Sequence, residues 1–496
     1  MPEELVTPEP PPPPCREQPD TSRAPAADGG DGGDGGSTPP GGVSPALTLV
    51  AALIGFFLVT LDASVVNVAL PAMGRELHGG LAALQWVVDG YTLAFASLML
   101  STGALSDRVG ASRAFAAGTA VFTAASVACG LAPDLVLLVA ARVVQGGAAA
   151  VVLPSSLALV RQAFPDARRR ARAIAVWAAG GSVAVALGPV AGGALTTAWS
   201  WRAVFFVNLP VGVAALALSA RVARSARRPA PLDLPGQATA VVALAALTYA
   251  VIEGGAAGAA AGAVGALALA GFLVIEARHP HPVVPLGLFR NGAAATAIAS
   301  GAAVTFGFFG GVFVLSLFFQ QVRGQSALTA GLMFLPMTLV ISVMNVLSGR
   351  ITNRYGPRVP MLVGQSGAVV GLLVLLPVGA GTPAVLTAVA MVPLSLGAAL
   401  AVPALTAAAM GAVPAERAGM AAGVLNAGRQ VAGALSVAVF GTLVGDGTHF
   451  VAGMRRGLLI AAVLLAGAAL ATACGLRGAR DEPAGAEGRK LGGGRA

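Results

Sequence analysis

The sequence predicts an all-α integral membrane protein with about fourteen transmembrane helices, and three observations lead to that class. Of its 496 residues, 56% are hydrophobic and only 11% are charged, whereas about 25% of the residues in a soluble domain are charged. Apolar stretches recur from residue 46 to residue 476. Each is about 20 residues long, the length of helix that crosses roughly 30 Å of hydrocarbon.

Fourteen apolar stretches define the expected spans. They lie near residues 46–70, 83–105, 113–131, 135–159, 173–197, 202–221, 236–253, 258–275, 294–319, 328–348, 360–380, 384–409, 418–444 and 456–476. Residues 254–265 are so rich in Ala and Gly that the hairpin between the seventh and eighth spans has no single expected position. An even number of spans places both ends of the chain on one side of the membrane.

The two ends of the chain differ from the spans in composition. Residues 1–44 are rich in Pro, Gly and Asp, and residues 477–496 are rich in Gly and Arg. Neither segment has enough apolar surface to offset the entropy lost on folding, so we expect two disordered cytoplasmic tails. The first tail has no basic segment ahead of an apolar one, so no signal peptide is expected.

Arginines are distributed unevenly between the two sides of the predicted topology. With the N-terminus inside, the inner loops receive most of them, including Arg168, Arg169, Arg170 and Arg172. Because positively charged loops stay in the cytoplasm, this asymmetry favours cytoplasmic tails. The net charge of +9 is therefore expected to reflect topology. A nucleic-acid partner is not expected, since no segment gathers arginines and aromatic residues on one soluble face.

Cysteine and histidine give no sign of a metal site or a disulfide framework. Cys15, Cys129 and Cys474 are far apart, and His279 and His281 are neighbours in a basic loop. No cluster of the Ser/His/Asp type is apparent at a membrane face either. We therefore expect no metal, no cofactor and no enzymatic activity.

Polar residues inside the spans are costly in hydrocarbon and therefore suggest function. Asp62 and Asn67 lie in the first span, and their alternative role is hydrogen bonding between helices. Arg142 lies several turns from either end of the fourth span, where snorkelling to the interface does not explain it. We expect it to face a cavity or a partner, with Gln145 close by on the same helix.

A short turn that follows the second span places an acid beside a base. A similar turn follows the tenth span, with Asn353 in place of Asp107. The turn residues are Asp107, Arg108 and Gly110 in the first, and Arg354 and Gly356 in the second. We interpret the first turn as a conformational latch between helix ends. The repeat itself indicates a transporter with its site between two related halves.

The fifth span contains a cluster of small residues around a proline. Its members are Gly188, Pro189, Gly192 and Gly193. Proline removes one backbone hydrogen bond, and glycines let another helix pack closely. We interpret this cluster as a hinge or a seal.

These motifs resemble the major facilitator superfamily, and specifically its branch of fourteen-span drug:proton antiporters. The matching segments are residues 61–71, 103–110, 142–146, 188–193, 201–212 and 419–430. The resemblance implies a six-helix bundle at residues 45–221 and another at residues 290–476. It also implies that the linker 222–289 carries two extra transmembrane helices, and that transport proceeds by alternating access.

The resemblance adds candidates for the site. Residues 86–91 resemble multidrug exporters of this branch, in which an acid at the position of Asp89 can meet cationic drugs. We expect Tyr91, two residues further on, to line the cavity together with Asn67 and Gln145. Residues 419–430 contribute three further polar residues, which we expect to line the cavity. They are Asn426, Arg429 and Gln430.

A carboxyl group in a low-dielectric cavity resists ionisation and can therefore carry a proton. Asp62, Asp89 and Glu253 are the candidates for proton coupling or substrate binding. Arg142 is expected to favour the ionised form of a neighbouring acid in one conformation and to leave it in the other. Such a cycle would couple proton release to rearrangement.

We therefore expect a monomeric, proton-coupled antiporter that exports lipophilic or cationic drugs or antibiotics. Abundant Ala, Gly and Arg, with Lys490 the single lysine, suggest a GC-rich bacterial genome and hence a bacterial cytoplasmic membrane. The alternatives are a metabolite importer or uniporter of the same fold, a membrane-embedded enzyme, and a receptor or scaffold that transports nothing. Counterflow in inverted vesicles would distinguish the importer from the exporter.

Overall fold

The computed structural model describes residues 44–227, 233–280, 282, 284–414, 417–445 and 449–475. Apart from Ser44, the expected tails 1–44 and 477–496 lie outside the described residues. Every regular element of the described chain is a helix, which confirms the predicted all-α class.

Seven helices form the first half of the described chain. They are α1 (Pro45–Glu76), α2 (Leu81–Val109), α3 (Ala111–Gly130), α4 (Leu135–Ala163), α5 (Ala167–Ala198), α6 (Ala203–Phe206) and α7 (Asn208–Ser219). Two of the long helices begin at aspartates that cap them: Asp134 accepts from the Leu137 N–H, and Asp166 accepts from the Arg169 N–H, both at 2.8 Å. Such caps satisfy N–H groups that the first turn of a helix leaves unpaired.

The second half of the described chain contains two short elements and eight α-helices. They are η1 (Leu286–Arg290), α10 (Gly292–Leu317), the π-helical turn η2 (Phe318–Val322), α11 (Ala327–Met333), α12 (Leu335–Tyr355), α13 (Arg358–Val374), α14 (Ala384–Ala390), α15 (Val392–Gly411), α16 (Ala418–Val444) and α17 (Phe450–Gly475). The breaks between α11 and α12 and between α14 and α15 precede Pro336 and Pro393. Proline lacks the N–H that would continue the helix.

Helices α8 (Leu234–Glu253) and α9 (Gly255–Arg278) form a hairpin between the two halves of the sequence. Its turn lies at Gly254 and Gly255, which have φ values of 60° and 57°, a region that glycine enters without strain. The structure therefore gives a position to the hairpin that the Ala- and Gly-rich sequence left open. Helix α8 also contacts the two halves, because Gln237 donates to Ser97 O of α2 and Thr442 of α16 donates to Val251 O at 2.9 Å.

The number of long apolar helices differs from the expected fourteen. Within the described residues, twelve helical segments are at least 18 residues long and apolar enough to cross a membrane. Two further apolar helices, Ala203–Ser219 and Arg358–Val374, are shorter and lie where the spans 202–221 and 360–380 were expected. Pro210 lies close to the break between α6 and α7 in the first of them, and the second ends at Val374. The count of fourteen is therefore not confirmed.

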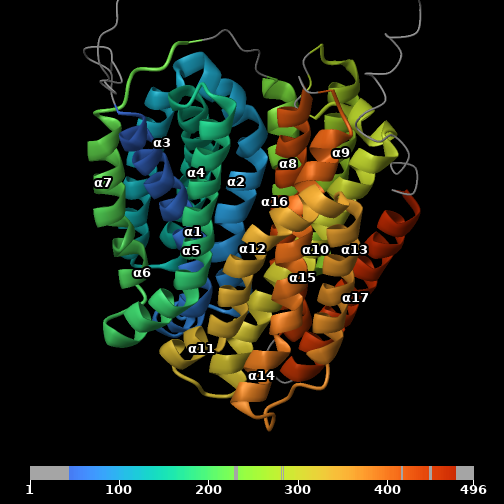
Figure 1. Cartoon of the computed structure of the whole chain (residues 1–496). Helices are drawn as coiled ribbons and strands as arrows, with labels where there is room; N and C mark the ends of the chain where they lie inside the picture. Colours follow the sequence, from blue (N-terminus) through green and yellow to red (C-terminus); the bar gives the residue numbers. More distant parts are fainter. Residues whose placement is uncertain are drawn as a thin grey trace, which may run out of the picture. The chain divides into compact units, whose positions relative to one another are not determined.

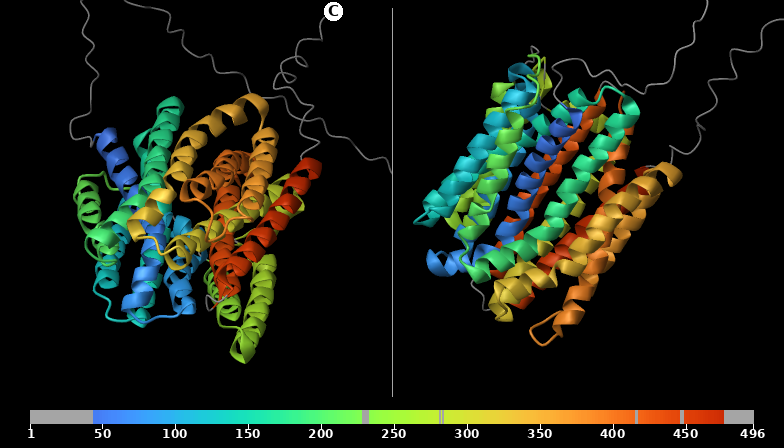
Figure 2. Two further views of the ribbon diagram at one scale, coloured as in Figure 1. Left: turned by 90° about the horizontal axis from the view of Figure 1, so that it is seen from below. Right: turned by 60° about the vertical axis from the view of Figure 1, so that its left-hand side comes forward.

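The helices are arranged as two groups that follow the order of the sequence. Figure 1 shows α1–α7 on the left and α10, α13 and α15–α17 on the right, with α12 between them and α11 below α5. The left view in Figure 2 separates the two groups, coloured blue to green and orange to red, whereas they overlap in the right view. The beginning of α1 and the end of α17 lie toward the upper end of Figure 1, whereas α11 and α14 lie at its lower end.

Glycines allow close packing inside the second group. A Cβ atom added to Gly364 of α13 would lie 2.6 Å from the carbonyl oxygen of Gly397 in α15. One turn along the same helix, a Cβ atom on Gly367 would meet only the Gly397 Cα, at 3.8 Å, an ordinary van der Waals contact. The pair of helices therefore approaches more closely at Gly364 than at Gly367.

We expect Gly364→Ala to lower the free energy of unfolding by about 1–3 kcal/mol, the usual cost of overpacking a core. Gly367→Ala is the matched control on the same helix and should leave stability nearly unchanged. Thermal unfolding of the purified variants in one detergent measures the difference. Equal melting temperatures for the two variants would contradict the close approach of α13 and α15.

Candidate transport site

A buried ion pair lies at the centre of the first group of helices. Arg142 Nη1 of α4 donates to Asp62 Oδ2 of α1 at 2.6 Å. Their side chains are 2% and 0% exposed. The Nε–H of Arg142 also donates to Val87 O of α2, at 3.1 Å. The sequence separates the two charged residues by 80 positions, so the fold alone brings them together.

Two amides complete the coordination of the Asp62 carboxylate. Oδ1 accepts from Gln145 Nε2 at 2.9 Å and from Asn208 Nδ2 at 2.8 Å. The side-chain oxygen of Gln145 in turn accepts from Arg142 Nη1 at 2.7 Å. The carboxylate therefore accepts three hydrogen bonds from three side chains, which is the condition under which a charge tolerates burial.

Asn208 is a member of this network that the sequence analysis did not single out. It lies at the start of α7, is fully buried, and contacts Asp62 and Ser126 of α3. The available signal was an amide inside an apolar stretch, the same signal that singled out Asn67.

The aromatic ring of Tyr91 packs against the buried guanidinium of Arg142. The guanidinium carbon of Arg142 lies 4.1 Å from the centroid of the Tyr91 ring, a separation at which cation–π attraction is favourable. The Tyr91 hydroxyl donates to Val59 O at 3.4 Å. One contiguous group therefore contains Asp62, Tyr91, Arg142 and Gln145. Asn67 lies on another face of α1.

The other two candidate acids lie outside this network. Asp89 is completely buried in α2, and neither of its carboxylate oxygens has a hydrogen-bond partner among the described residues. Glu253 is exposed at the end of α8, beside the hairpin turn at Gly254. The structure thus groups only Asp62 with the candidate arginine.

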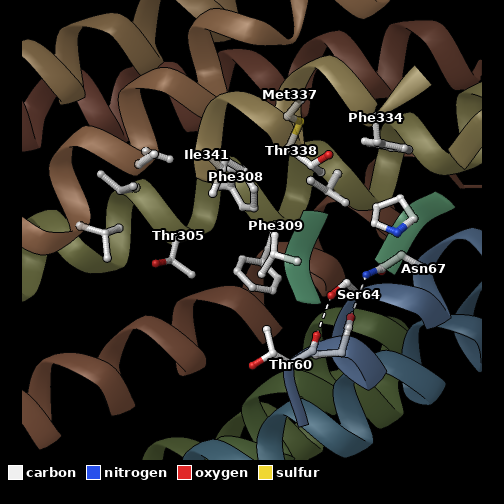
Figure 3. A pocket seen from close by; sticks show the side chains of 18 of the residues that line it. Thr60, Ser64, Asn67, Thr305, Phe308, Phe309, Phe334, Met337, Thr338 and Ile341 are labelled. Carbon is white, nitrogen blue, oxygen red and sulfur yellow. Dashed lines mark hydrogen bonds between the residues drawn. The ribbon is translucent and has the colours of Figure 1, made fainter. Parts of the chain in front are cut away.

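A cavity of about 260 Å³ lies between the two groups of helices. Its lining is Thr60, Ala63, Ser64 and Asn67 of α1; Val185 and Pro189 of α5; Val304, Thr305, Phe308, Phe309 and Val312 of α10; Phe334; Met337, Thr338, Ile341 and Asn345 of α12; Ala398, Ala399 and Val402 of α15; and Arg429 of α16. Figure 3 shows Phe308 and Phe309 in the middle of this group, with Thr60 and Ser64 on one side.

Only some of the expected cavity residues line it. Asn67 and Arg429 do, and so does Pro189 of the expected hinge or seal. Asn426 lies behind Arg429, because its Oδ1 accepts from Arg429 Nη1 at 3.3 Å. The remaining candidates, Tyr91, Gln145 and Gln430, are absent from the lining within the described residues. Neither Asp62 nor Asp89 is part of it.

The Gly- and Pro-rich segment of α5 contacts both groups of helices. Cβ atoms on Gly188 and Gly192 would clash with Ser64 and Val65 of α1. A Cβ atom on Gly193 would clash with the backbone of α11 at Ala327. The contact continues at Leu328, whose N–H donates to Thr197 Oγ1 of α5 at 3.1 Å.

Among the described residues, the turn that follows α2 lacks the ion pair expected of a latch. Asp107 and Arg108 are exposed, and Asp107 forms no ion pair in the part of the chain that the structure describes. Gly110 has a φ of 98°, and a Cβ atom there would lie 2.8 Å from Ser225 O. In the second turn, Gly356 has a φ of 72° and Arg354 is exposed. Both turns thus use glycine to reach a positive φ.

We expect Asp107→Asn to slow transport by about fivefold, the rate equivalent of about 1 kcal/mol, without changing substrate affinity. The reason is that a charge between helix ends acts on conformational exchange rather than on the cavity. Initial export rates and equilibrium binding of one substrate, measured side by side, separate the two effects. Asn353→Ala in the second turn is the control, and an equal loss of binding and turnover for Asp107→Asn would contradict the latch.

Comparison with known proteins agrees with this architecture. Residues 52–437 match the family model described as the Major Facilitator Superfamily. The chain belongs to the Major Facilitator Superfamily. It is a multi-pass membrane transporter, as predicted, and no enzyme.

Several curated relatives carry names that refer to drugs. The chain is 39% identical over 406 residues to the multidrug resistance protein Stp of Mycobacterium tuberculosis, covering 80% of this chain and 75% of that protein. It is 37% identical to the methylenomycin A resistance protein of Streptomyces coelicolor, covering 82% and 88%. It is also 34% identical to the tetracenomycin C resistance and export protein of Streptomyces glaucescens, covering 82% and 78%.

Solved structures share the fold at low sequence identity. The peptide transporter POT in complex with sulfate is similar with a TM-score of 0.66 and 17% identity, covering 86% of this chain and 94% of that one. A bacterial homologue of the lysosomal transporter Spinster has a TM-score of 0.61 and 16% identity, covering 88% and 97%. At this identity the likeness establishes the fold.

Proposed function

We propose that this protein exports drugs or antibiotics across a bacterial cytoplasmic membrane in exchange for protons, by alternating access. The names of its relatives support the substrate class, since they refer to resistance against several antibiotics and to export. The coupling to protons rests on the geometry of α1.

Helix α1 carries the ion pair on one face and the cavity lining on the other. Thr60, Ala63, Ser64 and Asn67 follow the spacing of a single helical stripe, and all four line the cavity. Asp62 lies off that stripe and points into the network with Arg142. This arrangement is the observation that carries the proposal, because a change at Asp62 acts on the helix that lines the cavity.

Protonation of Asp62 removes the charge that balances Arg142. The guanidinium then lies buried without a counter-ion, which is strongly unfavourable in a low-dielectric interior. The network relaxes by moving α1, α4 or α7, and the cavity face of α1 moves with it. Asp89 is the second candidate for a proton carrier, since its carboxyl group is buried in α2 and has no hydrogen-bond partner among the described residues.

We further propose that the chain crosses the membrane fourteen times, as its resemblance to the fourteen-span branch implies. The twelve long apolar helices of the described chain, which include α8 and α9, and the two shorter ones make the fourteen of that branch. With the tails in the cytoplasm, the contact between α5 and α11 lies on the outer side. The apolar lining supports lipophilic substrates, and one chain contains both groups, consistent with a monomer.

A transport experiment with an imposed pH gradient tests this function. We expect a susceptibility panel, with and without expression, to identify an exported antibiotic. Everted membrane vesicles with an imposed pH gradient should then accumulate that compound, and a protonophore should stop the accumulation. Accumulation that is independent of the gradient, or net movement in the opposite direction, would indicate a uniporter or an importer instead.

A further inference from the structure

We propose that the cavity selects substrates in which an apolar, aromatic body carries a carboxylate or a similar anionic group, and that Arg429 binds this group. The inference rests on the proposed export function and specifies the substrate class of the same cavity. It replaces the expectation of a cationic substrate.

The charges around the cavity favour an anion. Among the described lining residues, Arg429 is the one ionisable side chain, and neither Asp nor Glu is present. Asp62 is held by Arg142, and Asp89 is buried outside the lining. A cationic substrate would therefore approach an arginine with no carboxylate to balance it, and like charges repel strongly at low dielectric.

The guanidinium of Arg429 has N–H donors that no acceptor among the described residues uses. Its Nε–H donates to Thr305 Oγ1 at 3.1 Å, and Nη1 donates to Asn426 Oδ1 at 3.3 Å. Both acceptors are neutral, and a guanidinium has five N–H donors. The free donors form a planar fork that matches a carboxylate with two parallel hydrogen bonds. A cation without a counter-ion inside a membrane protein marks a functional site.

Gly301 fixes the position of this arginine. A Cβ atom on Gly301 of α10 would lie 3.2 Å from Cγ and 3.4 Å from Cδ of Arg429. The missing side chain lets the aliphatic part of Arg429 pack against α10. Thr305, one turn further along α10, then holds the guanidinium at the wall of the cavity.

The rest of the cavity suits an aromatic body. Phe308, Phe309 and Phe334 line it together with Met337 (Figure 3). Aromatic rings and a thioether bind flat apolar groups by offset stacking and by sulfur–ring contacts. A cavity of about 150 Å³ already holds benzene, so about 260 Å³ admits a bicyclic ring.

Three probes of one shape test the charge preference. They are 2-naphthoate, 2-naphthamide and 2-naphthylmethylammonium, and their binding to the purified full-length protein in lipid nanodiscs is measured by calorimetry at one pH. Empty nanodiscs give the contribution of the lipid. We expect the carboxylate to bind about tenfold or more tightly than the amide, the ratio expected for a hydrogen bond to a charged group, and the ammonium to bind most weakly.

Variants assign the preference to one side chain. Arg429→Gln should weaken naphthoate binding by about 10-fold to 150-fold and leave naphthamide binding unchanged, which also shows that the cavity is intact. Arg429→Lys should keep part of the preference, because it keeps the charge but loses the fork. Arg323→Gln is the control, since Arg323 is partly buried but lies outside the cavity lining.

The outcomes separate this proposal from the export function. Equal affinity for the three probes, tightest binding of the ammonium, or an equal effect of Arg429→Gln on all three would each overturn the anionic preference. None of these results depends on a proton gradient. If gradient-driven export persists while the probes show no preference, only the substrate class is wrong. If the preference holds while export is independent of protons, only the coupling is wrong.

Discussion

Asp62→Asn is expected to abolish gradient-driven export while substrate exchange at equal pH persists. Asn is close to Asp in size but cannot bind and release a proton, so the step that couples the network to the gradient is lost. Exchange needs no net proton movement and therefore continues. In everted vesicles, uptake driven by a pH gradient should fall to the level of vesicles without the protein, whereas counterflow of preloaded substrate should remain.

A stability cycle shows whether Asp62 acts through Arg142. Breaking a buried ion pair from one side costs about 3–5 kcal/mol, since the other charge remains buried. Asp62→Asn and Arg142→Gln should each lower the melting temperature, and the double variant should lose less stability than the sum of the two single losses. Strictly additive losses, or gradient-driven export that survives in Asp62→Asn, would exclude the pair as the coupling element.

Gly331→Val is expected to stop transport by preventing α5 and α11 from closing on each other. A Cβ atom on Gly331 would clash with the carbonyl group of Pro189. Backbone atoms cannot turn aside as a flexible side chain can, so the two helices must separate. We expect export to be lost and substrate binding to be affected much less, because Gly331 itself does not line the cavity and Pro189 is one of many lining residues.

Cross-linking measures the separation directly. Thr197→Cys and Leu328→Cys, in a chain without the native cysteines, place two thiols across this contact, and Gly331→Val should reduce their disulfide yield. Gly271→Val is the matched control, since a Cβ atom there meets no other atom within 4 Å. An unchanged yield together with normal export would show that the contact tolerates the extra volume.

Much of the fold followed from the periodicity and length of the apolar stretches. Long helices such as α1, α4 and α10 were predicted because each one alone exceeds the thickness of the hydrocarbon. The departures are local. The expected sixth span is split between α6 and α7, and α13 ends before the expected eleventh span does. Hydropathy averages over such breaks and does not detect them.

The candidate site was harder to predict from the sequence than the fold, because its hydrogen bonds and ion pair join segments that are distant in the chain. Asp62 has no base within a turn of its own helix, and its partner Arg142 comes from α4. Asn208 of α7 was not singled out at all. The expectation of a cationic substrate relied on the acids Asp62 and Asp89 within spans. The sequence does not show which way each side chain faces, because that depends on the rotation of the helix about its axis. In the structure both side chains lie outside the cavity lining.

The guanidinium of Arg429 in the cavity has an electrical consequence. If one proton enters for each monovalent cation exported, no net charge crosses the membrane. If one proton enters while a monovalent anion leaves, two elementary charges move in the same electrical sense. Each charge contributes about 2.3 kcal/mol per 100 mV, so the membrane potential would contribute roughly 4.6 kcal/mol per cycle at that voltage. Export of an anion bound at Arg429 would therefore be driven by voltage even when the pH on the two sides is equal.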